Sequence, residues 1–227
     1  MRYLFKSNTL FYSLAILLVL TACGNNRNSK SNKQKDKYEL FWQWFETKED
    51  EYFVYEKNQA KLFDSLDSKL SAIHPNITFI FSEAKEGKRD FIVSADSAKE
   101  AFLDVRELAR AAPNLKKWNV IAFRPRLNPL VSIAFKGLIV EPDDIMVKYN
   151  YNKENKLIDL ELYIKNYKKS DNRYLGASLV MLENALGESD AEMKIGTVEL
   201  KKFIQQPDNK NLIPLKELPK VVDSYFE

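Results

Sequence analysis

The residue types that most often perform nucleophilic catalysis and bind zinc are almost absent from this sequence, which has one cysteine, Cys23, and one histidine, His74. A Ser–His–Asp triad would have to use His74 as its base, and a site with two histidine ligands is excluded. His74 stands directly before Pro75, at the expected end of a helix, where a cation favours the helix dipole. We therefore expect a capping or surface role for it. The six glycines form no dinucleotide-binding or P-loop pattern, so the sequence predicts no cofactor, no metal and no catalytic residue.

Carboxylates are the remaining side chains for acid–base chemistry or cation binding. Glu188-Ser189 resembles the catalytic Glu-Ser pair of lytic transglycosylases, but residues 190–193 read Asp-Ala-Glu-Met instead of the Gly-Leu-Met-Gln type of segment. We interpret Glu188 as a polar residue without a special role. Glu141, Asp143 and Asp144 lack the alternating ligands and central glycine of calcium loops, which favours a solvated turn. A carboxylate-based hydrolase stays open as a third hypothesis.

Aromatic and arginine side chains are the candidates for binding. Large aromatic rings mostly fill cores, so core packing is the first interpretation and a binding patch for a glycan or a partner is the second. Two arginines flank Pro125 after an expected strand and are surface cations suited to an acidic partner. The candidate binding residues are Trp42, Trp44, Phe45, Trp118, Arg124 and Arg126.

The first 23 residues follow the order of an export signal. Arg2 and Lys6 precede an apolar run of eleven residues, Leu10 to Leu20, and small residues then lead into Cys23. A membrane-spanning helix needs about twenty apolar residues, so this run is too short. Residues 20–23, Leu-Thr-Ala-Cys, resemble the lipobox of bacterial lipoproteins. An ordinary cleaved signal peptide is the alternative.

The lipobox resemblance implies that residues 1–22 are a signal peptide and that Cys23 becomes a lipidated cysteine carrying a diacylglyceryl group and a third acyl chain such as palmitate. Two or more acyl chains anchor a protein stably, so the protein would be exported and tethered to a membrane through lipid. Gly24, in place of aspartate, resembles lipoproteins sorted to the outer membrane. The expected location is therefore the outer membrane if the cell has one, and otherwise the outer face of the cell membrane.

Basic charge is concentrated between the lipobox and the expected domain. Residues 24–37 contain five basic residues, one acidic residue and no apolar residue, so residues 23–37 are expected to form the lipidated cysteine and a disordered tether. Residues 38–227 contain 28 basic and 31 acidic residues. A nucleic-acid-binding domain is usually basic, so the composition predicts no nucleic-acid partner.

Hydrophobic periodicity predicts helices and strands in separate runs and shows no internal repeat. The predicted helices cover about 48–73, 97–112 with Ser97 to Glu100 as a capping box, 172–186 with Leu175, Leu179, Leu182 and Leu186 as the buried seam and Gly187 as a C-cap, and 215–226. The predicted strands cover 77–81, 91–95, 118–124, 131–136, 145–151, 157–164 and 193–203, with turns at 86–88 and 152–155. This order indicates an α+β fold, a largely antiparallel sheet with helices packed on one face, in a single domain at 38–227.

Two stretches resemble a group of uncharacterised bacterial proteins. One is residues 91–125, with Phe-Ile-Val-Ser-Ala-Asp and Trp-Asn-Val-Ile-Ala-Phe-Arg-Pro, and the other is residues 182–196, with Leu-Glu-Asn-Ala-Leu-Gly-Glu and Ile-Gly. The resemblance spans most of residues 38–227 and implies one integral domain, but no activity and no functional residue.

Two functional hypotheses from different classes follow. The first is a lipid-anchored, non-enzymatic domain of the cell envelope that binds another envelope protein. The alternative is an envelope lipoprotein with a pocket for a glycan, peptide or lipid, lined by Trp42, Trp44 or Trp118.

Overall fold

The computed structural model describes residues 36–203 and 212–226, which belong to one compact unit. Cys23, the predicted signal peptide and most of the predicted tether lie outside the described residues. Lys37, predicted to belong to the tether, is the first residue of a helix. Within the described ranges, no helix is both long enough and apolar enough to cross a membrane.

Helices and strands alternate in groups, which confirms the α+β class. The helices of the described ranges are α1 (Lys37–Glu46), α2 (Glu49–Phe53), α3 (Gln59–Ser71), α4 (Phe102–Arg110), α5 (Arg173–Leu186), α6 (Glu188–Lys194) and α7 (Leu218–Phe226). Short 3-10 turns include η1 (Tyr55–Lys57), η2 (Lys99–Ala101), η3 (Pro142–Asp144) and η5 (Leu215–Glu217). The strands are β1 (Thr78–Phe81), β2 (Arg89–Ser94), β3 (Trp118–Ala122), β4 (Ile133–Phe135), β5 (Leu138–Val140), β6 (Ile145–Asn152), β7 (Leu157–Ile164), β8 (Ile195–Lys202) and β9 (Ile213–Pro214).

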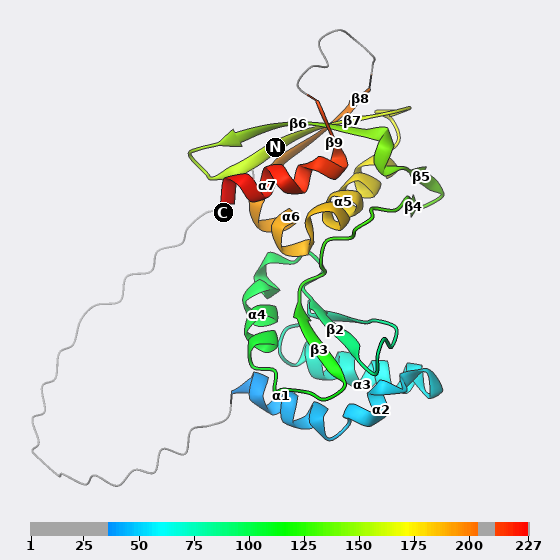
Figure 1. Cartoon of the computed structure of the whole chain (residues 1–227), viewed down its shortest axis with the longest axis vertical. Coiled ribbons are helices and arrows are strands. Elements are labelled where there is room, and N and C mark those ends of the chain that lie inside the picture. Colours follow the sequence, from blue (N-terminus) through cyan, green and yellow to red (C-terminus); the bar gives the residue numbers. More distant parts are fainter. Residues whose placement is uncertain (1–35, 204–211, 227) are drawn as a thin grey trace, which may run out of the picture. The chain divides into compact units, whose positions relative to one another are not determined.

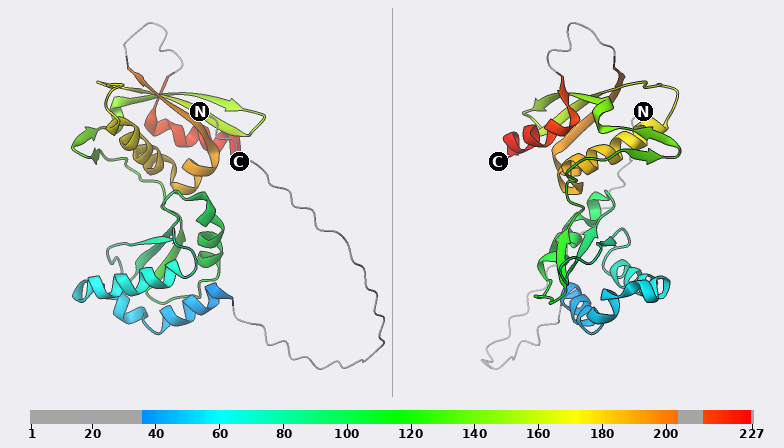
Figure 2. Two further views of the ribbon diagram at one scale, coloured as in Figure 1. Left: turned by 180° about the vertical axis from the view of Figure 1, so that it is seen from behind. Right: turned by 45° about the vertical axis from the view of Figure 1, so that its right-hand side comes forward.

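The described unit has two separate hydrophobic cores, and we call the parts around them the first lobe (residues 36–123) and the second lobe (residues 127–226). Residues 124–126 connect them. The first lobe contains the sheet β1-β2-β3, and the second contains the sheet β8-β7-β6-β9 and the hairpin β4-β5. Figures 1 and 2 show each lobe with its own helices and strands.

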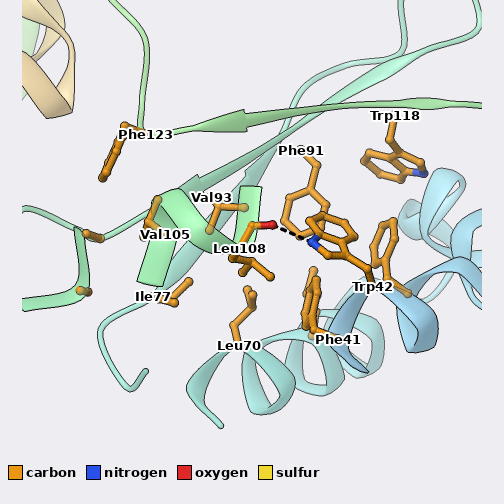
Figure 3. Packing of buried hydrophobic residues seen from close by; sticks show 14 of the residues in the cluster. Phe41, Trp42, Leu70, Ile77, Phe91, Val93, Val105, Leu108, Trp118 and Phe123 are labelled. Atoms are coloured by element: carbon orange, nitrogen blue, oxygen red, sulfur yellow. Dashed lines mark hydrogen bonds between the residues drawn. The ribbon is translucent and has the colours of Figure 1, made fainter. Parts of the chain in front are cut away.

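The first-lobe core is built from aromatic rings. Trp42 and Phe45 come from α1 and Phe91 from β2, and Figure 3 shows several of these side chains converging. The ring centres of Phe45 and Phe91 lie 5.1 Å apart, and those of Trp42 and Phe91 lie 5.6 Å apart. Such edge and tilted contacts add to the free energy gained from burying large rings. On the other side of this sheet, Ile80 is 43% exposed, so helices cover one face.

The second-lobe core is mainly aliphatic. Along β7 the side chains of Ile158, Leu160, Leu162 and Ile164 are buried, which confirms the predicted alternation. Figure 2 shows α5 and α7 on the same side of this sheet. At the predicted turn, Asn152 Oδ1 accepts a hydrogen bond of 3.0 Å from the amide of Glu154.

The two lobes share a topology that the sequence did not reveal. In the first, the antiparallel pair β1-β2 is followed by α4 and by β3, which runs parallel to β2. In the second, the antiparallel pair β6-β7 is followed by α5, α6 and β8, which runs parallel to β7. Parallel neighbours require a crossover connection, and a helix provides it in both lobes.

Several predicted elements were wrong in detail. The predicted long helix over 48–73 is divided into α2, η1 and α3, because Val54 and Asn58 have non-helical backbone angles. The predicted capping box at Ser97 is absent: Ser97 has φ +63°, and its hydroxyl donates to Glu183 Oε2 at 3.4 Å instead of capping α4. The predicted strand over 193–203 begins only at Ile195, since α6 precedes it.

Candidate functional site

Three of the four aromatic candidates lie in the core of the first lobe. Trp42, Phe45 and Trp118 are 2%, 0% and 3% exposed. The indole nitrogen of Trp42 donates a 2.7 Å hydrogen bond to the carbonyl of Leu108, drawn in Figure 3. This burial agrees with the core-packing interpretation and leaves these rings no surface for a ligand. Trp44 is half-buried, with the ammonium of Lys69 5.5 Å from its ring centre.

Arg124 lies where the two lobes meet. Its guanidinium donates to the carboxylate of Glu183 on α5, and its Nη1 lies 3.2 Å from Oδ1 of Asp96 in the first lobe. Burial lowers the pKa of Arg124, but the hydrogen bond and charge of Glu183 outweigh that effect and raise the pKa above its ordinary value. Arg124 is therefore paired with carboxylates of its own chain.

Arg126 is paired in the same way. It forms a two-pronged contact with Asp223 on α7, at 2.8 Å and 2.6 Å, and a 2.6 Å contact with Asp190 on α6. The hydrogen bond to Asp223 is the main cause that raises the pKa of Arg126 further above its usual value. Bidentate arginine–carboxylate pairs fix geometry as well as charge. The expectation that these arginines are free surface cations for an acidic partner is therefore not supported.

Glu188, which the sequence analysis set aside, is a buried carboxylate at the junction. It is 1% exposed and accepts hydrogen bonds from the amides of Ala95 at 2.8 Å, Ser97 at 3.3 Å and Arg124 at 3.0 Å. Burying a carboxylate is costly unless hydrogen bonds and a counter-charge compensate it, and here three amides and the nearby guanidinium do so. Glu188 therefore joins α6 of the second lobe to the loop after β2 of the first.

The backbone at this junction is strained and closely packed. Asp96, Ser97 and Phe123 have φ values of +48°, +63° and +66°. Non-glycine residues in this region cost about 1–3 kcal/mol each and persist only where their surroundings hold them. A side chain at Gly187 would bring its Cβ to 3.2 Å from the carbonyl of Arg124, so glycine permits the close approach of α6 to the connector. Its position as the C-cap of α5 confirms the prediction.

A groove of about 480 Å³ opens beside this junction, which we call the α5 groove. Its residues come from both lobes, and Lys99 and Glu192 form an ion pair of 3.2 Å at its rim. Gly176 lies against the ring of Phe135, where a Cβ would be only 2.4 Å from the ring. The main apolar residues of the groove are Phe135, Leu179, Val180, Leu182, Ile195 and Val198, and its polar residues are Asp96, Ser97, Lys99, Glu183 and Glu192.

The leucine seam predicted for this helix is wrong in its first half. Leu175 and Leu179 are 49% and 48% exposed, and Val180 is 38% exposed. The core-facing side of α5 is instead made by smaller and mixed residues, Tyr174, Ala177, Ser178, Met181, Leu182, Ala185 and Leu186. Because α5 is apolar around most of its circumference, periodicity alone could not select the buried face. The sequence signal for this second apolar surface was that α5 contains more apolar residues than one buried face needs.

The remaining predicted sites show ordinary contacts. Asp144 pairs with Lys165 at 3.3 Å, and Asp143 lies 4.0 Å from Lys216. Within 36–203 and 212–226, no cluster of three or more His, Cys, Asp or Glu residues could hold a metal ion. His74, just after α3, accepts a 3.2 Å hydrogen bond at Nδ1 from the amide of Asn76.

No family model, curated protein or solved structure matches this chain. The site must therefore be interpreted from its own geometry.

Proposed function

We propose that this protein is a lipid-anchored, non-enzymatic binding domain of the bacterial cell envelope, and that the α5 groove holds an apolar segment of an envelope protein. The α5 groove carries the proposal: it combines half-exposed apolar side chains, Leu179 and Val180, with a charged rim. Apolar walls with a few polar groups at the edge are typical of binding sites. The lipid anchor rests on the resemblance of residues 20–23 to a lipobox.

The two other hypotheses have less support. A pocket lined by tryptophans would use Trp42, Trp44 or Trp118. Trp42 and Trp118 are buried, and the half-buried Trp44 is not among the residues that line the α5 groove. A carboxylate-based hydrolase would need two acids that reach a substrate. The acids that line the groove are Asp96, Glu183 and Glu192, and each is paired with a cation of its own chain, Arg124 or Lys99. Glu188 has a fully buried side chain whose oxygens are held by three amides, so it is not accessible to a substrate.

The test is site-specific photocrosslinking in intact cells. A photoreactive amino acid replaces Leu179 in the groove, and a matched control carries it at Ile139, which is 67% exposed but lies on β5 and does not line the groove. We expect one stoichiometric protein product from position 179 and none from position 139. The product should weaken about ten-fold when Val180→Asn is added, because a buried apolar contact is lost from the interface.

The result has three distinguishable outcomes. A protein adduct specific to position 179 supports the proposal. An adduct with the mass of a small lipid or peptide overturns the protein partner and favours the ligand-binding alternative. Equal labelling at 179 and 139 overturns the groove as a binding site. A Cys23→Ala variant and the mass of the mature N-terminus test the anchor separately.

A further inference from the structure

The outward face of α4 carries a row of cations around one leucine. Lys99 in the preceding turn η2 is exposed, as are Leu103, Arg106 and Arg110 on α4. The spacing of three and four residues places the last three on one side of the helix. Leu103 is 64% exposed. The opposite side of α4 is buried through Phe102, Val105 and Leu108. We call the exposed row the basic stripe.

Most cations of the basic stripe have no ion-pair partner among the described residues. Within the described part of the chain, Arg106 and Arg110 form no ion pair or hydrogen bond, whereas Arg124 and Arg126 are fully paired. Lys99 pairs with Glu192, but its side chain remains 64% exposed. The same segment also carries acidic residues: Glu100 accepts a 2.8 Å hydrogen bond from the side chain of Asn76, Asp104 pairs with Lys37, and Glu107 is partly exposed beside the stripe.

The described chain begins next to this stripe. Tyr38 donates a 2.7 Å hydrogen bond to Oδ1 of Asp104, and the ammonium of Lys37 donates to the same carboxylate. Asp104 is adjacent to Leu103, so the first turn of α1 is fixed against α4. Thirteen residues, 23–35, separate the described chain from its predicted lipid attachment. Even fully extended, such a segment spans at most about 45 Å.

We propose that the basic stripe is the face that this domain turns toward an anionic membrane surface, an inference that rests on the proposed lipid anchor for its biological setting. Cations near an anionic bilayer strengthen binding about five-fold each, and a leucine among them can enter the interface. A short link to a lipid keeps the domain close to the bilayer. There, an electrostatic attraction that is too weak to bind the domain by itself can still set the domain's orientation. Lys99 belongs to both surfaces, so this orientation would bring the rim of the α5 groove beside the bilayer, whereas Leu179 and Val180 lie on another helix.

The test uses the compact unit Lys35–Glu227, without Cys23 and without most of the basic residues before α1. Its sedimentation is measured with vesicles of equal parts phosphatidylglycerol and phosphatidylcholine, and with pure phosphatidylcholine, at low salt. We expect binding to the anionic vesicles alone, and loss of that binding at 0.5 M salt, where the screening length is about 4 Å. Arg106→Gln with Arg110→Gln should reduce the partition coefficient about 25-fold.

The matched control is Lys153→Gln with Lys168→Gln, which changes the net charge equally on exposed parts of the second lobe. Retained binding in this control supports the proposal. Equal loss in both double variants, or equal binding to anionic and neutral vesicles, overturns it. Since this unit lacks Cys23, failure of vesicle binding refutes the orientation and leaves the anchor standing. An unmodified Cys23 in cells, together with stripe-dependent vesicle binding, refutes the anchor and leaves the stripe.

Discussion

The two lobes use one topology and differ in what their crossover helix shows to the outside. In the first lobe α4 buries all its large apolar residues except Leu103 and exposes cations. In the second lobe α5 is apolar on both sides, and its outer side forms a groove through Leu179 and Val180. A ββαβ unit needs only the inner side of its helix to fold. The residues on the outer side of the helix can therefore differ between the lobes, and the surfaces of the two lobes differ there.

The cores also differ in kind. The first is dominated by interlocking rings and the second by aliphatic side chains on β7 and α5. All three tryptophans, Trp42, Trp44 and Trp118, belong to the first lobe. Tryptophan fluorescence therefore reports on that lobe alone, whereas circular dichroism reports on both. The unfolding of the first lobe can therefore be compared with that of the whole described unit by using the two signals together.

The largest effect is expected from a cavity in the aromatic core. Phe45→Ala removes a ring that is 0% exposed and contacts Tyr52, Phe91 and Trp118. We expect the free energy of unfolding to fall by about 3–5 kcal/mol, because the rigid neighbours cannot close the space. Urea denaturation followed by fluorescence measures it. A loss below about 1 kcal/mol would show that this core is not tightly packed, and Leu179→Asn, at a half-exposed position, is the control with a change within about 0.5 kcal/mol.

The next effect concerns the link between the lobes. Glu188→Ala leaves the amides of Ala95, Ser97 and Arg124 without their acceptor and should cost about 3 kcal/mol. In the wild type, fluorescence and circular dichroism should give coincident unfolding curves, as expected for one cooperative unit. In the variant the two curves should separate.

The control for this link is Glu217→Ala, which removes a partly exposed carboxylate whose ion pair, with Lys220 at 2.8 Å, lies within the second lobe. We expect its curves to stay coincident. If the Glu188 variant also unfolds in one coincident step, the buried carboxylate is not what couples the lobes.

The smallest effect is a titration at the start of α5. Asp171 accepts hydrogen bonds from the side chain and amide of Arg173, which lower the pKa of Asp171 from 3.8 to about 2. A folded-state pKa below the unfolded value means that this contact stabilises the fold above about pH 4. That contribution is lost as the pH falls through about 2. The crossover helix of the first lobe begins instead with the turn η2, and neither crossover helix has a side-chain hydrogen bond from its N-cap residue.

Carboxyl NMR measures this titration directly. Arg173→Gln should return the Asp171 midpoint toward 3.8, because the guanidinium that favours the ionised form is gone. A wild-type midpoint already near 3.8 would show that the pair does not form in solution.

Local pattern determined much of this fold. The alternation of Ile158, Leu160, Leu162 and Ile164 defined β7, because a half-buried strand has a period of two. Gly187 marked the end of α5, because a positive φ favours glycine there. The strand and helix order was sufficient for the α+β class. The lipobox resemblance and the predicted tether also come from the sequence alone.

Tertiary structure decided the rest, since it depends on contacts between residues far apart in the chain. Nothing local shows that Glu188 accepts a hydrogen bond from Ala95, which lies 93 positions earlier. Nothing local separates the leucines of α5 that are buried from Leu175 and Leu179, which are exposed. Tertiary contacts divide the fold into two cores and pair Arg124 and Arg126 with carboxylates of their own chain. They also form the groove where the lobes meet. The sequence determined which elements form, and packing between them determined which side chains remain available to a partner.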